Sequence, residues 1–193
     1  MRSAILIATL FVCGSSFVHA QSGRRINARH GLWFDVGFGG GSAGVECPSC
    51  GSDRISGASG YFRLGGTLSR HILVGAETNG WLHSEGGVDE TIGFGSIVVL
   101  WYPSATGALY LKVGLGGMTY RADDGFDEFT ATAPSASIGI GYEFRVGRNV
   151  SLVPFANSLV SSSVRLRFDG VPIATDEDIS INLFQFGLGV TFH

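Results

Sequence analysis

Two cysteines, Cys47 and Cys50, have a spacing with recognisable chemistry. In a redox CxxC motif one thiolate is activated at a helix N-terminus, usually within a βαβ unit. Here glycine-rich sequence flanks the pair on both sides, and no helical pattern follows it. We therefore expect a local loop disulfide, which export from the cytoplasm would permit. Redox chemistry or metal binding is the alternative.

Carboxylates gather at two places, at Asp123, Asp124, Asp127 and Glu128 and again at residues 176–178. Hard oxygen ligands at this density could hold Ca²⁺ or Mg²⁺, so the first group is a candidate loop cation site. Neither group has the spacing of an EF-hand loop. Charge that solubilises an exposed loop is the favoured interpretation, and we expect no metal and no other cofactor.

The run His83-Ser84-Glu85 contains the residue types of a hydrolase relay. Consecutive residues of a strand point to opposite faces, so these three cannot form a relay unless the chain bends there. The histidines at positions 30, 71 and 193 fall at the ends of expected strands. The sequence therefore favours a protein that is not an enzyme.

The chain that positions these residues has 193 residues, which fits one domain. Residues 1–20 have the pattern of a signal peptide, with Arg2, an apolar run over 4–12, and small residues before a cleavage point after Ala20. We expect a periplasmic tail at 21–30 and one β domain at 31–193. Cleavage removes Arg2 and no acidic residue, so the formal charge changes from −3 to −4, which does not favour nucleic-acid binding.

After residue 30, apolar residues alternate with small or polar ones in stretches about 20 residues apart. One example is Leu109, Leu111, Val113 and Leu115. The breaks are alternately short, near 69–71, 103–107 and 147–149, and long, near 45–54, 84–90, 121–129 and 167–178. This alternation is typical of an up-and-down transmembrane barrel of about eight antiparallel strands, with short periplasmic turns and long outer loops. The stretch 91–102 is apolar on both faces, and its register cannot be assigned.

The volume of a small barrel predicts which face points inward. An eight-stranded barrel has room for few large side chains, so glycine and small polar residues should line the bore and the bulky apolar set should meet lipid. Because buried charge needs a partner, we expect the inward-facing charges to form an ion-pair network in the lumen. Its members would be Asp35, Arg63, Glu77, Lys112, Glu143 and Arg145. A soluble barrel with scattered surface charges is the alternative.

Aromatic residues near the strand ends are expected to form two interfacial belts. The periplasmic belt would contain Trp101, Tyr102, Tyr142, Phe144 and Phe192, and the outer belt Tyr120, Phe126 and Phe129.

With these features the chain resembles the small outer-membrane barrels of the OmpA/OmpX type. The segment Phe184, Phe186, Leu188, Val190 and Phe192 is similar to the C-terminal signal that the outer-membrane assembly machinery reads, although His193 follows the last phenylalanine here. The resemblance implies an integral outer-membrane protein of a Gram-negative bacterium. We expect it to be a monomer that contacts outer-membrane lipids, lipopolysaccharide and the assembly machinery.

The fold does not determine the function, because barrels of this group have several. A filled lumen argues against a wide pore. We expect a non-enzymatic barrel that supports envelope integrity or surface interaction through its extracellular loops. The alternatives are a narrow channel or transporter for small solutes and an outer-membrane lipid-modifying enzyme.

Overall fold

A computed structural model describes residues 29–46, 54–125, 127–162, 164–169, 171–173 and 179–193. All of its regular elements in these ranges are strands. They are β1 (Leu32–Glu46), β2 (Arg54–Thr67), β3 (Ile72–Glu85), β4 (Val88–Trp101), β5 (Leu109–Asp123), β6 (Glu128–Tyr142), β7 (Phe144–Arg145), β8 (Val150–Ser161), β9 (Arg165–Phe168), β10 (Val171–Ile173) and β11 (Ser180–Phe192). The expected signal peptide, Cys47 and Cys50 lie outside the described residues.

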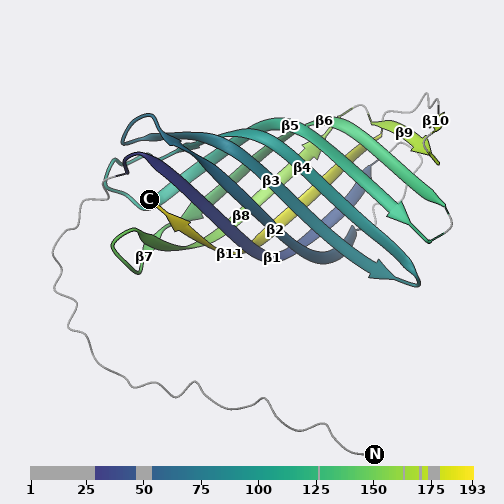
Figure 1. Ribbon diagram of the computed structural model, residues 1–193, viewed down its shortest axis with the longest axis horizontal. Coiled ribbons are helices and arrows are strands. Elements are labelled where there is room, and N and C mark those ends of the chain that lie inside the picture. Colours follow the sequence, from purple (N-terminus) through teal and green to yellow (C-terminus); the bar gives the residue numbers. More distant parts are fainter. Residues whose placement is uncertain (1–28, 47–53, 126, 163, 170, 174–178) are drawn as a thin grey trace, which may run out of the picture.

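The strands form one closed antiparallel barrel (Figure 1). Strands β1 to β6 pair in chain order, β6 then pairs with β8, β8 pairs with β11, and β11 returns to β1. Eight strands thus complete the circle, while β7 pairs with β8 and the β9–β10 hairpin extends the edge of β6. The predicted fold class is confirmed.

The two ends of the barrel differ. One end holds the start of β1 and the end of β11 (Figure 1), and we call it the terminus end. The short turns that join β2 to β3, β4 to β5 and β7 to β8 lie there. We call the opposite end, to which β3 and β5 run, the loop end.

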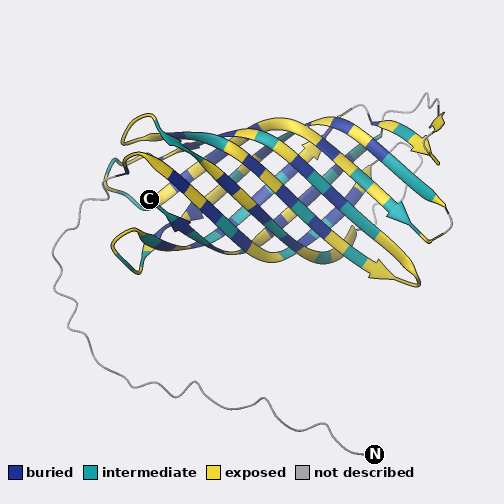
Figure 2. Ribbon diagram, viewed as in Figure 1, coloured by how far each residue is buried: buried dark blue, intermediate teal, exposed yellow. Residues whose placement is uncertain are grey.

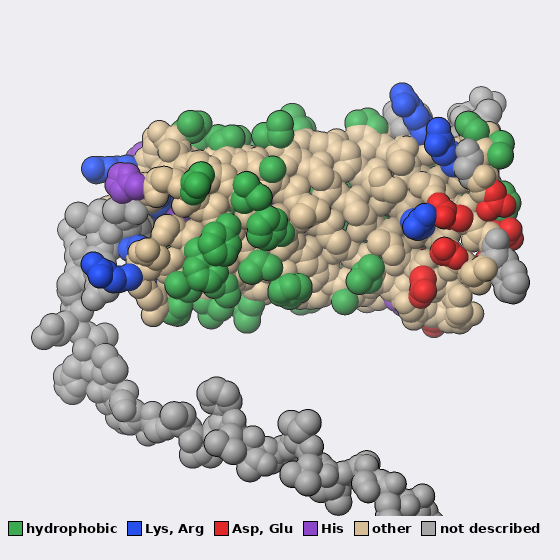
Figure 3. All heavy atoms as spheres, in the orientation of Figure 1, with side chains coloured by type: hydrophobic (Ala, Val, Ile, Leu, Met, Phe, Trp, Pro, Cys, Tyr) green, Lys and Arg blue, Asp and Glu red, His purple; other side chains and the backbone are tan. Residues whose placement is uncertain are grey.

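The bulky apolar face of the strands points outward. Phe34, Leu111, Ile140 and Phe186 are between 41% and 56% exposed, and burial alternates along every long strand (Figure 2). In the ambiguous stretch 91–102, Val98 is buried and Ile97 is exposed, which assigns the register. Figure 3 shows the hydrophobic side chains gathered over the half of the wall nearer the terminus end, with acidic and basic groups at the loop end. An apolar belt on the outside of a closed barrel is stable only against lipid.

Among the described residues, no helix is long and apolar enough to cross a membrane.

Two of the breaks expected to be long loops are largely strand. Strands β3 and β4 continue to a two-residue turn at Gly86 and Gly87, whose φ angles of 62° and 88° fit a type I′ hairpin. Strands β5 and β6 pair from Asp123 and Glu128 inward, so only residues 124–127 join them. The polar residues that the sequence assigned to these two loops belong to strands. They lie beyond the apolar belt, where both faces of a strand can meet water.

The lumen is more apolar than the sequence predicted. An outer apolar cluster fills the loop-end half and includes Trp81, Ile92, Phe94, Met118 and Leu183. A second apolar cluster fills the terminus-end half, with Trp33, Leu73, Val98, Leu100, Tyr102, Tyr110 and Val153. The expected bore of glycines and paired ions is therefore corrected to two packed layers with ions between them.

Inward-facing glycines make room for these large side chains. A Cβ on Gly141 would lie 2.3 Å from Cζ of Tyr110, and a Cβ on Gly37 would lie 2.4 Å from Cε1 of Tyr61. The glycines thus allow rings from neighbouring strands to lie across the bore.

The expected aromatic belts are partly wrong for the same reason. Tyr102 is fully buried in the lumen, and Tyr120 and Phe129 pack against the outer apolar cluster. Trp101, Tyr142 and Phe144 do face outward near the terminus end, and Phe192 stacks on Phe34 at a ring separation of 4.4 Å. Phe126 lies outside the described residues.

Candidate functional site

Four charged side chains from different strands meet in the middle of the lumen, and we call them the central quartet. Asp35, Arg63 and Glu77 are direct cross-strand partners on β1, β2 and β3. Arg63 Nη2 lies 2.9 Å from Asp35 Oδ2, and its Nε lies 3.4 Å from Glu77 Oε2. Lys112 reaches over from β5, and its Nζ lies 2.6 Å from Glu77 Oε1.

Register explains why Lys112 can reach Glu77 across an intervening strand. The residue of β4 opposite Glu77 is Ser96, whose side chain is small. The four charged side chains are between 0% and 1% exposed. Two acids and two bases therefore neutralise each other without solvent, as a buried ion cluster requires.

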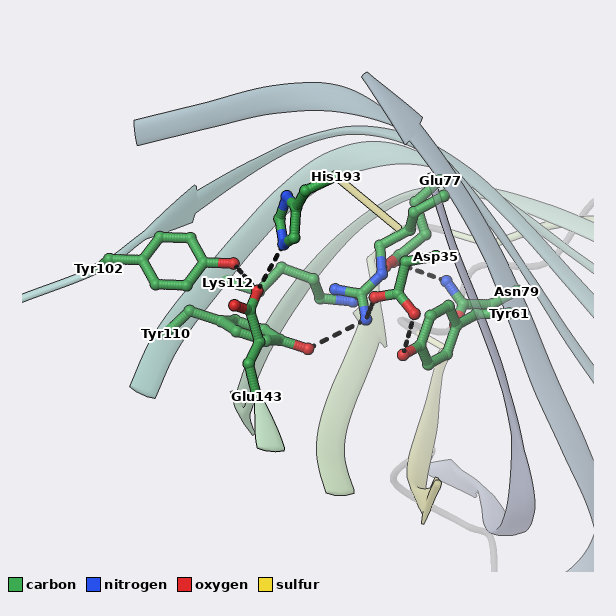
Figure 4. Close-up of polar contacts among 10 residues, drawn as sticks. Asp35, Tyr61, Glu77, Asn79, Tyr102, Tyr110, Lys112, Glu143 and His193 are labelled. Atoms are coloured by element: carbon green, nitrogen blue, oxygen red, sulfur yellow. Dashed lines mark hydrogen bonds and ion pairs between the residues drawn. The ribbon is translucent and has the colours of Figure 1, made fainter. Parts of the chain in front are cut away.

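Neutral polar groups surround the central quartet (Figure 4). Tyr61 Oη donates to Asp35 Oδ1 at 3.1 Å, and Asn79 Nδ2 donates to Glu77 Oε1 at 2.7 Å. Arg63 Nη2 donates to Tyr110 Oη at 3.1 Å, and the Arg63 guanidinium carbon lies 4.0 Å from the Tyr61 ring centre. These contacts hold the charged groups in one arrangement.

A second polar cluster lies at the terminus end, around Glu143, and we call it the mouth cluster. Glu143 Oε2 lies 3.2 Å from Arg29 Nη2, and Oε1 lies 3.3 Å from His193 Nε2. Tyr102 Oη donates to Glu143 Oε1, and Arg29 also donates to the carbonyl of Gly107 at 2.6 Å. The Arg29 guanidinium carbon lies 3.5 Å from the Tyr102 ring centre. Residues from before β1 and after β11 are thus held by one carboxylate.

Glu143 lies between β6 and β7, outside the spanning strands. Burial by itself would raise the pKa of Glu143. The hydrogen bond from His193 and the charges of His193 and Arg29 more than offset burial, and they hold the pKa below its ordinary value of 4.5. Burial and the neighbouring Glu143 charge raise the pKa of Tyr102, which keeps its hydroxyl a donor.

Five of the six residues expected in the lumen network are buried inside the barrel. Asp35, Arg63, Glu77 and Lys112 form the central quartet, and Glu143 belongs to the mouth cluster. Arg145 lies on β7 and is half-buried, and the cation beside Glu143 is Arg29.

Sequence reasoning missed the remaining members of both clusters. Arg29 was assigned to a periplasmic tail, yet it is 1% exposed within the mouth of the barrel. The sequence does hold a hint that Arg29 faces inward: it is odd-numbered, like the inward-facing Trp33 and Asp35 of β1. Strand parity puts Tyr61 and Tyr110 on the inward face, but their role as hydrogen-bonding partners of the ions is visible only in three dimensions.

The candidate loop cation residues are occupied in other ways. Asp123 Oδ1 accepts from the Gly125 amide, and Asp124 Oδ1 accepts from the Asp127 amide, both at 2.8 Å. Glu128 Oε2 lies 2.6 Å from Arg121 Nη2. In the described ranges, no three His, Cys, Asp or Glu side chains come together as metal ligands would. Asp123 and Asp124 thus take part in the tight turn between β5 and β6.

The hydrolase-like run is also not arranged as a relay. His83 Nδ1 faces the backbone carbonyl of Ser56 at 3.0 Å, and its Nε2 lies 3.3 Å from Glu85 Oε2. Neither ring nitrogen has a serine hydroxyl as its partner in the described part of the chain.

The segment similar to an assembly signal forms most of β11. Phe184, Phe186 and Leu188 face outward and are exposed, Val190 and Phe192 follow on the same face, and β11 closes the barrel against β1. The segment therefore lies at the closing seam.

The sequence matches no protein-family model and no curated protein. Solved structures do match. Neisserial surface protein A has a TM-score of 0.60 at 12% identity, covering 83% of this chain and 96% of that one. The outer membrane protein OprG from Pseudomonas aeruginosa has a TM-score of 0.51 at 10% identity, covering 86% and 98%. The attachment invasion locus protein Ail of Yersinia pestis has a TM-score of 0.51 at 14% identity, covering 85% and 99%.

These likenesses agree with the apolar belt and the closed eight-strand circle. The short-turn terminus end corresponds to the periplasmic side of such barrels, and the loop end corresponds to the outer side. The chain has the fold of the small eight-stranded outer-membrane β-barrels, and its exposed apolar belt is the surface that meets lipid in such barrels.

Proposed function

We propose that this protein is a non-enzymatic barrel that supports envelope integrity or surface contact through its outer strands and turns, and that solutes do not pass through it. The observation that carries the proposal is the filling of the lumen. On β3 Glu77 lies between Leu73 and Trp81, and on β5 Lys112 lies between Tyr110 and Met118. All six side chains are at most 4% exposed. An ion that crossed would have to displace two apolar layers and a neutralised ionic layer.

Conductance of the refolded protein in planar bilayers tests the closed lumen. We expect no discrete current steps at protein amounts for which a wide-pore porin, measured as the positive control, gives many. Regular steps from the wild-type protein would favour the narrow-channel alternative and would refute the proposal.

The non-enzymatic part has its own test. Refolded protein incubated with labelled phospholipid or lipopolysaccharide should release no acyl chains. Release that stops in a His83→Ala variant would establish the lipid-modifying alternative, because His83 belongs to the run whose residue types match a hydrolase relay.

A further inference from the structure

Outward-facing arginines gather on the wall of β5, β6 and β9, beyond the apolar belt. Arg121 of β5 is the cross-strand partner of Thr130, and Thr130 is the partner of Arg167 on β9. In the adjacent outward row, Thr119, Thr132 and Arg165 are partners in the same way. Arg121, Arg165 and Arg167 are exposed, whereas Leu166 turns inward onto the outer apolar cluster. We call these three arginines and three threonines the arginine patch.

Two guanidinium groups of the patch, those of Arg165 and Arg167, have no carboxylate partner among the described residues. Arg121 is paired with Glu128 at 2.6 Å, and Glu128 also accepts from Thr130 at 3.0 Å. Asp169 at the end of β9 accepts from the Glu128 amide. Within the described residues Arg165 and Arg167 form no ion pair. A guanidinium presents a planar fork of donors that fits phosphate oxygens, and threonine hydroxyls add further hydrogen bonds.

Apolar grooves lie further along β5 and β6, towards the terminus end. One groove of about 430 Å³ is lined by Leu111, Val113, Ile138, Ile140, Ala156 and Phe184. A second of about 540 Å³ is lined by Ile97, Val99, Val113, Leu115, Ala136 and Ile138. Ala136 follows Thr132 by four residues, so the groove begins roughly 13 Å along the strand from the patch. A lipid whose headgroup contacts the patch would have its chains beside these grooves.

The patch and the grooves together define one kind of occupant. Cations at the outer end of the belt complement an anionic headgroup, and the grooves below complement acyl chains. The hydroxyls between the arginines suit a sugar. We propose that this wall of the barrel binds a phosphorylated glycolipid of the outer leaflet, with phosphate on Arg165 and Arg167 and acyl chains over β5 and β6. The proposal adds a lipid partner that the function proposed above does not require.

Native mass spectrometry of barrels released from phosphatidylcholine nanodiscs containing a diphosphorylated, acylated glucosamine disaccharide tests this proposal. Wild-type protein should retain one such lipid. Arg165→Ala/Arg167→Ala should retain it about tenfold less, as expected for loss of a charge-assisted bidentate contact. The matched control, Arg70→Ala/Arg148→Ala, removes two exposed arginines from turns at the periplasmic end and should bind like wild type.

Other lipids distinguish the proposed site from general charge attraction. The dephosphorylated glycolipid and phosphatidylglycerol should both be retained weakly, and the soluble diphosphorylated sugar without acyl chains should not be retained. Equal retention of phosphatidylglycerol, or equal retention of the glycolipid by the Arg165/Arg167 variant, would overturn the proposal. Folding of each variant is checked by its shift on an unboiled gel. If the double variant does not fold, Arg167→Gln alone should show the same direction of loss, and unchanged retention by that variant would overturn the proposal.

Discussion

At the scale of single residues, the Glu77 carboxylate is the centre of the lumen. It receives Arg63 from one side and Lys112 from the other, and Asn79 donates to it as well. Removing one partner of a buried ion pair leaves an uncompensated charge, which costs several kcal/mol, whereas removing both partners costs much less. The quartet should therefore behave as a strongly coupled unit.

A double-mutant cycle measures this coupling. We expect Lys112→Met to lower the free energy of unfolding by about 3 kcal/mol, because Glu77 then loses one of its two cationic partners. Adding Glu77→Gln to Lys112→Met should recover part of the loss, with a coupling energy of about 1–3 kcal/mol. Urea unfolding in lipid vesicles provides the measurement.

The exposed pair Arg121–Glu128 is the matched control for the cycle. Its N–O distance of 2.6 Å equals that of the Lys112–Glu77 pair. Its two side chains, however, are 55% and 40% exposed. Its coupling should be much weaker than that of the lumen pair, because solvent screens it. Similar coupling energies for the two pairs would mean that the lumen is not solvent-excluded.

At the scale of elements, the segment before β1 belongs to the barrel. Arg29 passes into the periplasmic mouth and is held by Glu143, the Gly107 carbonyl and the Tyr102 ring. His193 after β11 contacts the same Glu143. This carboxylate therefore fastens the chain near both edges of the seam where β1 meets β11.

Glu143→Gln should loosen this fastening. In detergent-refolded protein, trypsin should cleave after Arg29 about tenfold faster in the variant, because a charge-assisted hydrogen bond is lost while the Gly107 contact remains. Mass analysis identifies the cut. Glu85→Gln, which removes an exposed carboxylate at the other end, should leave the rate unchanged.

The same variant predicts a pH dependence. The folded pKa of Glu143 is below 4.5, so its charge stabilises the folded state fully at pH values above 4.5. That stabilisation is lost as pH falls through the lower, folded pKa. The difference in unfolding free energy between wild type and Glu143→Gln should shrink as pH falls below 4.5. A difference that grows on acidification would contradict the assignment.

At the scale of the whole molecule, the barrel is longer than its apolar belt. Outward residues of β5 change from Leu111 and Val113 near the terminus end to Thr119 and Arg121 near the loop end. The hydrogen-bonded wall thus continues past the lipid and carries its polar residues on strands.

Arginine substitutions along one face of β5 test this placement. Val113→Arg should cost about 2–4 kcal/mol of unfolding free energy in vesicles, because Val113 lies within the belt, whereas Thr119→Arg should cost about 0–1 kcal/mol. Both side chains face outward on the same strand. Equal costs would mean that the belt does not end between these residues.

Much of this architecture follows from the sequence alone. The period-two alternation predicts the strands, and the bulk of the apolar face against the glycines and charges of the other face predicts which side meets lipid. Inward positions such as Asp35, Glu77 and Lys112 follow from parity, because successive strand residues point to opposite faces.

Tertiary structure decided what fills the bore and which charges meet. Parity places Tyr61 and Tyr110 inside, but whether their rings fit beside the ions depends on the register that sets Gly37 and Gly141 opposite them. Glu143 pairs with Arg29, whereas Arg145 lies on β7. This pairing depends on the path by which the segment before β1 joins the barrel. The contact between Arg29 and Glu143 joins residues 114 positions apart, and a periodic pattern carries information only about neighbours along the chain.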